Sequence, residues 1–60
     1  MEVQMKLLTV REIARALQVS YETALHMVKH DMRYFRLGRQ YRVTEESFAQ
    51  YIRLLERRSR

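Results

Sequence analysis

The polar side chains between residues 20 and 29 are those whose types and spacing could do chemistry. They combine hydroxyl, carboxylate, imidazole and ammonium groups, and they alternate with apolar residues at intervals of three and four. Such spacing places them on the face of a helix opposite its apolar stripe. Hydrogen-bonding groups on a helix can read the edges of nucleobases; Glu22, for example, can accept from cytosine N4 or instead orient a neighbouring arginine. The candidate residues are Ser20, Tyr21, Glu22, His26 and Lys29.

A second polar set surrounds the single glycine of the chain. Residues 35–37 and 41–43 each read apolar, arginine, apolar, as half-buried strands do. The glycine between them predicts a tight hairpin, with Arg36 and Arg42 on one face and Arg39 at its tip. Residues 33–42 contain four arginines and no acid, which favours contact with phosphate over a merely solvated surface. The candidate residues of this hairpin are Arg36, Gly38, Arg39, Gln40 and Arg42.

Two other chemical interpretations are weaker. His26 and His30 have the spacing of a two-histidine metal site, but Asp31 is the only further ligand nearby, so we expect no metal. Ser20 could be a nucleophile only beside a base and an orienting group, and nothing is arranged that way. A helix-capping hydroxyl that also donates to phosphate fits it better. We therefore expect no catalytic residue, no cofactor and no enzymatic activity.

Length and composition limit the remaining choices. Sixty residues with 47% hydrophobic content and no cysteine predict one domain, residues 1–60 with a core over about 7–55, held by packing alone. No apolar run approaches the ~20 residues that span a membrane, and no signal peptide is evident, so a cytoplasmic protein without a membrane partner is expected. The net charge of +5 arises wholly in residues 33–60, where eight arginines stand against three glutamates. An arginine surplus of this kind is suited to phosphate.

The helix that carries the first polar set follows another helix. Thr9 and Glu12 form a capping box, which predicts a helix over about residues 10–17. Ser20 is a good N-cap for a second helix over about residues 21–29. The short break between them indicates a helix-turn-helix, whose second helix is offered to a DNA groove.

The rest of the chain completes the predicted fold. Residues 1–6 either fray or add a short edge strand. Thr44 caps a third helix after the hairpin, and an apolar stripe on that helix is expected in the core. The order is helix, helix, hairpin, helix, which makes a mostly α fold with a small β-hairpin. The stripe consists of Phe48, Tyr51, Ile52 and Leu55.

Two stretches of the chain resemble excisionase-type winged helix-turn-helix domains, close relatives of the DNA-binding head of MerR-type regulators. They are LLTVREIARALQVSYETALHMV (residues 7–28) and FRLGRQYRV (residues 35–43), and with the capped last helix the resemblance covers about residues 7–55. It implies a non-enzymatic protein whose second helix enters the major groove and whose hairpin wing contacts the backbone or the adjacent minor groove. The groove-facing and wing residues implied by position are the two candidate sets above.

We expect from this a sequence-specific double-stranded DNA-binding protein, namely an excisionase or recombination directionality factor that bends DNA near attachment sites and has an integrase or recombinase as partner. Alternatives of the same class are a small transcriptional regulator, a MerR-like DNA-binding head and a phage small-terminase-like DNA-recognition domain. An alternative of another class is a protein-interaction adaptor, which would bind random duplex weakly and with little salt dependence. We expect a monomer in solution and cooperative assembly on neighbouring DNA sites, because no obvious dimer helix is present.

Overall fold

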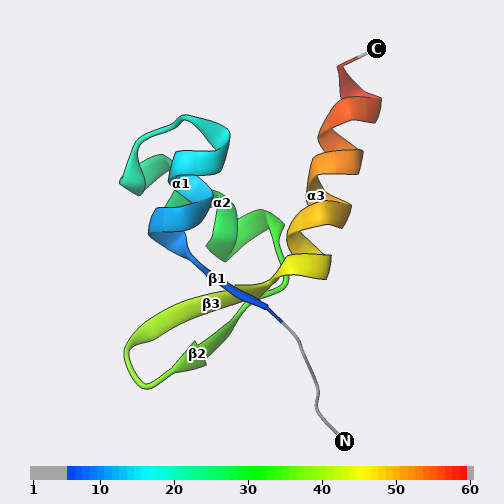
Figure 1. Cartoon of the computed structure of the whole chain (residues 1–60). Helices are drawn as coiled ribbons and strands as arrows, with labels where there is room; N and C mark the ends of the chain where they lie inside the picture. Colours follow the sequence, from blue (N-terminus) through cyan, green and yellow to red (C-terminus); the bar gives the residue numbers. More distant parts are fainter. Residues whose placement is uncertain (1–5, 60) are drawn as a thin grey trace, which may run out of the picture.

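Three helices and a three-stranded sheet form the part of the chain that the computed structural model describes, residues 6–59 (Figure 1). The predicted order of helix, helix, hairpin and helix is confirmed, as is the mostly helical fold. The expectation that residues 1–6 either fray or add a short edge strand falls mostly outside the described residues, which begin at Lys6; the first observed strand begins at Leu7. The elements are β1 (Leu7–Thr9), α1 (Val10–Leu17), α2 (Tyr21–Asp31), β2 (Phe35–Leu37), β3 (Gln40–Thr44) and α3 (Glu45–Arg58).

Helix α1 begins and ends through local hydrogen bonds. The Thr9 hydroxyl accepts from the Glu12 N–H at 3.0 Å, and the Glu12 carboxylate accepts from the Thr9 N–H at 2.9 Å, so the predicted capping box is confirmed. At the other end Gln18 adopts a left-handed conformation with φ of 58°. This turn lets the Val19 N–H donate to the Ala14 carbonyl at 3.0 Å and closes the helix.

Helix α2 follows after the predicted turn. Its N-cap is Ser20, whose hydroxyl accepts from the Thr23 N–H at 3.1 Å. The helix continues two residues beyond the expected Lys29 and ends at Asp31. The chain leaves it without a glycine because Met32 is extended, so no left-handed residue is needed there.

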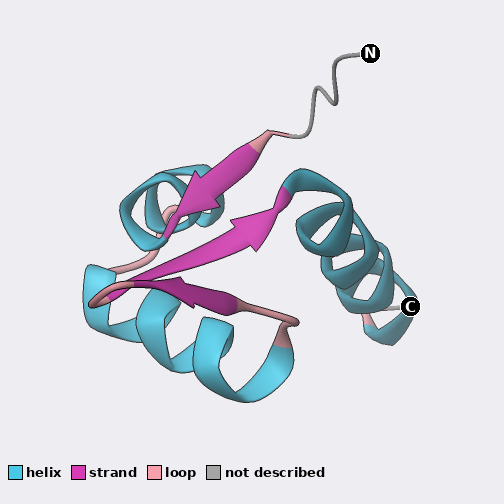
Figure 2. Ribbon diagram, turned by 90° about the horizontal axis from the view of Figure 1, so that it is seen from below, coloured by secondary structure: helices cyan, strands magenta, loops and turns pink. Residues whose placement is uncertain are grey.

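The sheet lies beneath the helices and carries the hairpin away from them (Figures 1 and 2). Its strand order is β1-β3-β2, and both pairings are antiparallel. Strand β3 is therefore central, and it leads directly into α3 through the cap that Thr44 supplies. The sheet thus fixes the hairpin to the start of α1 on one side and to α3 on the other.

The register of the hairpin corrects one expectation. Arg36 lies opposite Tyr41, and Phe35 lies opposite Arg42. Because opposite residues of an antiparallel pair share a face of the sheet, Arg36 and Arg42 lie on opposite faces. The expectation that they share a face is wrong. It assumes a three-residue loop, whereas Gln40 already belongs to β3, and a one-residue change of register reverses every side chain.

The core lies between α1, α2 and the covered face of the sheet. Its largest fully buried side chains are Ile13, Val28 and Val43, one from each of these elements. Helix α3 adds Tyr51, whose hydroxyl donates to the Asp31 carboxylate at 3.2 Å. This bond joins the last helix to the end of α2.

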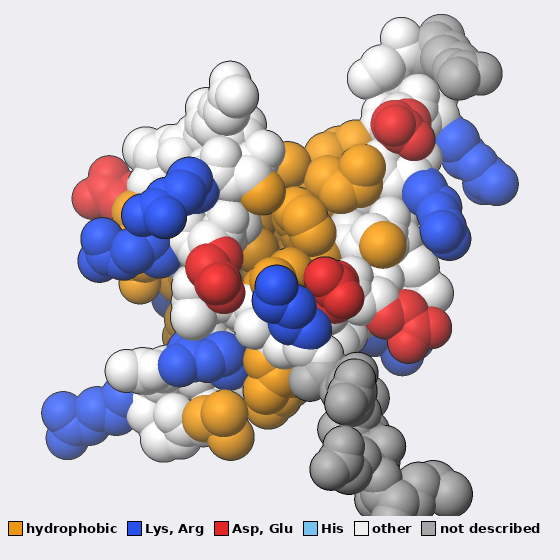
Figure 3. Space-filling model, viewed as in Figure 1, with side chains coloured by type: hydrophobic (Ala, Val, Ile, Leu, Met, Phe, Trp, Pro, Cys, Tyr) orange, Lys and Arg blue, Asp and Glu red, His pale blue; other side chains and the backbone are white. Residues whose placement is uncertain are grey.

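Helix α3 packs less completely than its apolar stripe predicts. Tyr51 is buried, and Phe48 and Leu55 are half-buried against the core. Ile52 is half-buried outside that cluster, and Leu54, two residues further along the helix, is exposed. Figure 3 shows apolar surface still visible between α3 and the first two helices. The expectation that the stripe lies in the core is therefore confirmed for Phe48, Tyr51 and Leu55 but not for Ile52.

Candidate nucleic-acid interface

An open groove of about 540 Å³ lies between the start of α1, one side of α2 and the hairpin. Four of its lining side chains are cationic and none is acidic, so the groove presents a positive surface to an anion. Three of the residues, spaced four apart, come from one side of α2. The lining residues are Thr9, Val10, Arg11, Tyr21, Leu25, Lys29, Arg39, Gln40, Tyr41 and Arg42.

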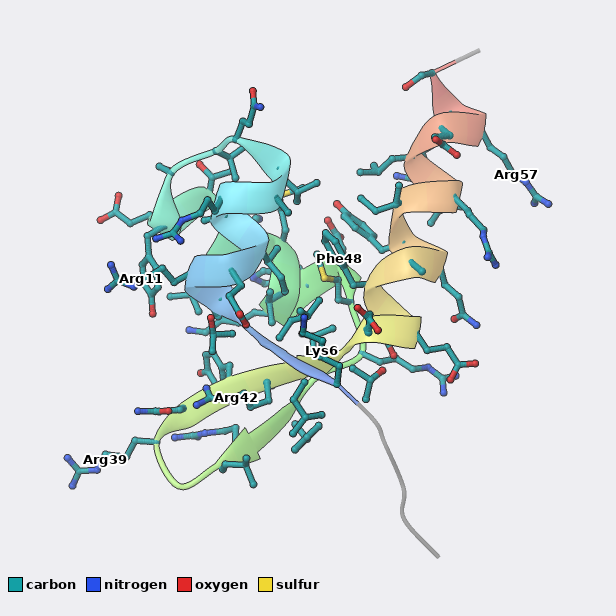
Figure 4. The ribbon with its side chains drawn as sticks, viewed as in Figure 1. Lys6, Arg11, Arg39, Arg42, Phe48 and Arg57 are labelled. Carbon is teal, nitrogen blue, oxygen red and sulfur yellow. The ribbon has the colours of Figure 1, made fainter. Side chains whose placement is uncertain are left out.

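The cations of the groove come from α1, from α2, which contributes Lys29, and from the hairpin. Arg11 of α1 lies with its guanidinium carbon 5.9 Å from the centre of the Tyr21 ring, so it is held beside the start of α2. Arg42 of β3 donates to the Gln40 side chain and, at 2.9 Å, to the Tyr41 carbonyl. Arg39 extends from the tip of the hairpin, on the same side of the molecule as Arg11 (Figure 4).

Tyr41 joins the hairpin to α2. Its ring lies 5.4 Å from the Lys29 ammonium nitrogen of α2 and 5.4 Å from the Arg36 guanidinium carbon of β2. The ring of Tyr34 meets it edge-on, with the ring centroids 5.3 Å apart. These contacts set the distance between hairpin and helix, and hence the width of the groove.

The exposed face of α2 adjoins the groove. Glu22 and His26 are exposed and lie on the side of the helix away from the buried Ala24 and Val28. His26 also stacks with His30, the ring centroids being 4.3 Å apart. Among residues 6–59 no three potential metal ligands of the His, Cys, Asp and Glu types lie together.

The candidate residues from the sequence fall into two groups. Those that line the groove together are Tyr21, Lys29, Arg39, Gln40 and Arg42. The others lie beside it: Ser20 caps α2, Glu22 and His26 occupy the exposed helix face, Arg36 packs on Tyr41, and Gly38 supplies the positive φ of 63° in the turn.

Five groove residues belong to neither candidate set from the sequence: Thr9, Val10, Arg11, Leu25 and Tyr41. Arg11 reads as an ordinary solvent-facing residue of α1, and only the packing of α1 against α2 brings it beside Tyr21. Leu25 belongs to neither candidate set and is half-buried at the groove wall. Its spacing of four residues from both Tyr21 and Lys29 is a signal that could have found it.

Other arginines lie on α3, outside the lining of the groove. Arg53 and Arg57 lie on α3, and Figure 4 shows Arg57 pointing away from the side that carries Arg11 and Arg39. Figure 3 shows basic side chains on both flanks and also near the middle of this face, where acidic side chains lie beside them. No helix among residues 6–59 has the length and apolar character needed to cross a membrane.

Comparison with known proteins agrees with this geometry. A family model described as a helix-turn-helix domain matches residues 7–53, which include α1, α2 and the hairpin. No curated protein and no solved structure is significantly similar to the chain. A helix-turn-helix places its second helix in a DNA groove, which points to DNA as the partner. The chain belongs to the helix-turn-helix domain family.

Proposed function

We propose that this protein binds double-stranded DNA sequence-specifically, with α2 in the major groove and the hairpin acting as a wing on the flanking backbone. The observation that carries the proposal is the groove, whose four cations are contributed by α1, α2 and the hairpin without an acid among them. Phosphate contacts from several elements fix the orientation of a protein on a duplex. A sugar-phosphate strand lying in this groove would bring the exposed face of α2 to the bases.

The base-reading residues in this proposal are those on the exposed face of α2. Glu22 can accept from cytosine N4, while His26 and Lys29 can donate to purine acceptors. Tyr21 and Leu25 stand between the helix and the groove, where an apolar side chain can contact a thymine methyl group. The Ser20 hydroxyl oxygen caps α2. Ser20 thus lies at the N-terminus of the helix, where phosphate binding is favoured.

The wing residues have different roles in the proposal. Arg39 at the tip and Arg42 in the groove contact phosphate, and Gln40 orients Arg42. Arg36 supports the wing through Tyr41 and completes the positive surface. Gly38 permits the two-residue turn, because its φ of 63° lies where other residues are strained.

For the biological role we propose an excisionase or recombination directionality factor that bends DNA, with an integrase or recombinase as partner, in the cytoplasm. The support is the resemblance of residues 7–55 to such domains, including their MerR-like relatives. A small transcriptional regulator is the second candidate, since the same interface would serve it. Within this proposal the chain is a single non-enzymatic domain without a cofactor.

Assembly belongs to the same proposal. One module of this size buries about 600–1,000 Å² against DNA, so useful affinity calls for several copies on neighbouring sites. We propose a monomer in free solution that assembles cooperatively on DNA. Because α3 leaves Leu54 exposed and Ile52 half-exposed, sedimentation of the free protein is needed beside titrations on one-site and multi-site duplexes. A tight dimer without DNA would contradict this part.

The test of sequence-specific binding is selection of duplexes from a random pool. The wild-type protein should enrich a defined sequence, and Glu22→Ala or His26→Ala should change the enriched bases at about 1–3 kcal/mol per lost contact. Glu56→Ala is the matched control, since Glu56 is an exposed helical glutamate on α3. Failure to enrich any sequence, or enrichment unaffected by either α2 variant, would remove α2 as the reader.

A further inference from the structure

The wing has an apolar face that no described element covers. Leu37 and Phe35 lie on the same face of the hairpin, because they pair with Gln40 and Arg42 across the strands. Arg36 and Tyr41 occupy the other face, toward α2. Leu37 is 53% exposed, the most exposed large hydrophobic residue of the described chain, and Phe35 is 39% exposed. In the view from below, the sheet lies in front of α1 and α2, and α3 stands to one side of it (Figure 2).

Two arginines adjoin this apolar surface. Leu37 comes directly before the turn that carries Arg39, and Arg42 lies on the same face as Phe35. Residues 33–44 contain four arginines and no acid. An acid-free apolar tip is complementary to stacked bases between two phosphate backbones, whereas an exposed leucine on an ordinary surface has no such surroundings.

The dimensions of the tip decide how it can enter DNA. Two hydrogen-bonded strands are about 5 Å apart and carry side chains on both faces, so they do not fit an unperturbed minor groove about 6 Å wide. A groove widened by a kink can admit them. Apolar side chains such as Leu and Phe are the ones that open a base step in this way, and they kink the duplex toward the major groove.

We propose that Leu37 is a wedge: it enters the minor groove next to the major groove held by α2, partly unstacks one base step and kinks the DNA. Phe35 lies behind it on the same face and closes the opened groove against water. Arg39 holds the phosphates beside the opened step. This inference rests on the proposed DNA-binding function and adds to it a residue that produces bending.

The experiment uses the best duplex recovered by selection with the wild-type protein. One form carries a donor and an acceptor dye at its two ends, and a series of forms carries 2-aminopurine at successive positions. Wild-type protein should raise energy transfer between the ends and should raise 2-aminopurine fluorescence at one step only. Leu37→Ala should lose at least half of the first increase and nearly all of the second. It should still bind, because Arg39 and the groove are unchanged.

Leu54→Ala is the matched control, since it truncates another exposed leucine, 42% accessible, on α3. It should leave both signals as in the wild type. Equal bending by Leu37→Ala and wild type would overturn the wedge while leaving DNA binding intact, as would a wild-type complex that is straight. Absence of any binding by the wild type would instead overturn the proposed function and the wedge with it.

Discussion

The contact between Tyr41 and α2 should determine both the stability of the wing and its position. In Tyr41→Leu the apolar bulk remains, but the ring that faces Lys29, Arg36 and Tyr34 is lost. Two exposed cation–π contacts contribute about 0.5 kcal/mol each, and an aromatic pair about 0.5–1.5 kcal/mol. The free energy of unfolding should therefore fall by about 1.5–2.5 kcal/mol.

Urea unfolding followed by circular dichroism measures this loss. Tyr41→Phe is the matched control, because it keeps the ring and should stay within about 0.5 kcal/mol of the wild type. DNA affinity should fall further in the Leu variant than in the Phe variant, because a loosened wing no longer sets the groove width. If Tyr41→Leu were as stable as the wild type, the ring contacts would not hold the wing against α2.

Three smaller changes test the local chemistry of the fold. Gln18→Gly should raise stability by about 1 kcal/mol in thermal melts, because Gln18 has a φ of 58° that glycine adopts without strain; a lower melting temperature would contradict this. The Thr9 backbone N–H donates to the Glu12 carboxylate and lowers the pKa of Glu12 below its ordinary 4.5. The folded state therefore binds a proton at Glu12 less tightly than the unfolded state, and the stability that this carboxylate contributes is lost as pH falls through the lowered pKa. Glu12→Gln should reduce this acid sensitivity, which urea titrations at pH 7 and below pH 4.5 measure. Tyr51→Phe should cost about 1 kcal/mol at neutral pH by removing the bond to Asp31. Burial and the charge of Asp31 raise the pKa of Tyr51 above 10.0, so wild-type stability falls as pH rises beyond that value and the variant should lack this loss.

The features that could be predicted from the sequence are those that depend on interactions between neighbouring residues. The caps at Thr9, Ser20 and Thr44 act within one helical turn, and all three are found where their residue types place them. The hairpin is equally local, since alternation around Gly38 is enough to predict it. Its register is not, because a turn of two or three residues is equally compatible with one glycine.

What escaped prediction depends on contacts between distant residues. Strand β1 has three residues and exists because β3 pairs with it, with Leu8 opposite Val43. Arg11 joins the groove only through the packing of α1 on α2, and Ile52 is left half-exposed only because nothing described covers that side of α3. Residue type thus predicts five of the ten residues that line the groove, whereas the shape of the groove follows only from the fold.

The salt dependence of DNA binding tests the central claim most directly. Duplex affinity measured at several salt concentrations should fall steeply for the wild type, and Arg39→Ala should lower the log–log slope by about one unit, the effect of one lost phosphate contact. Arg57→Ala removes the same charge from α3, on the opposite side of the molecule, and should leave the slope unchanged (Figure 4). Equal slopes for the Arg39 variant and the wild type, or equal losses from both variants, would contradict binding through the groove between α2 and the wing.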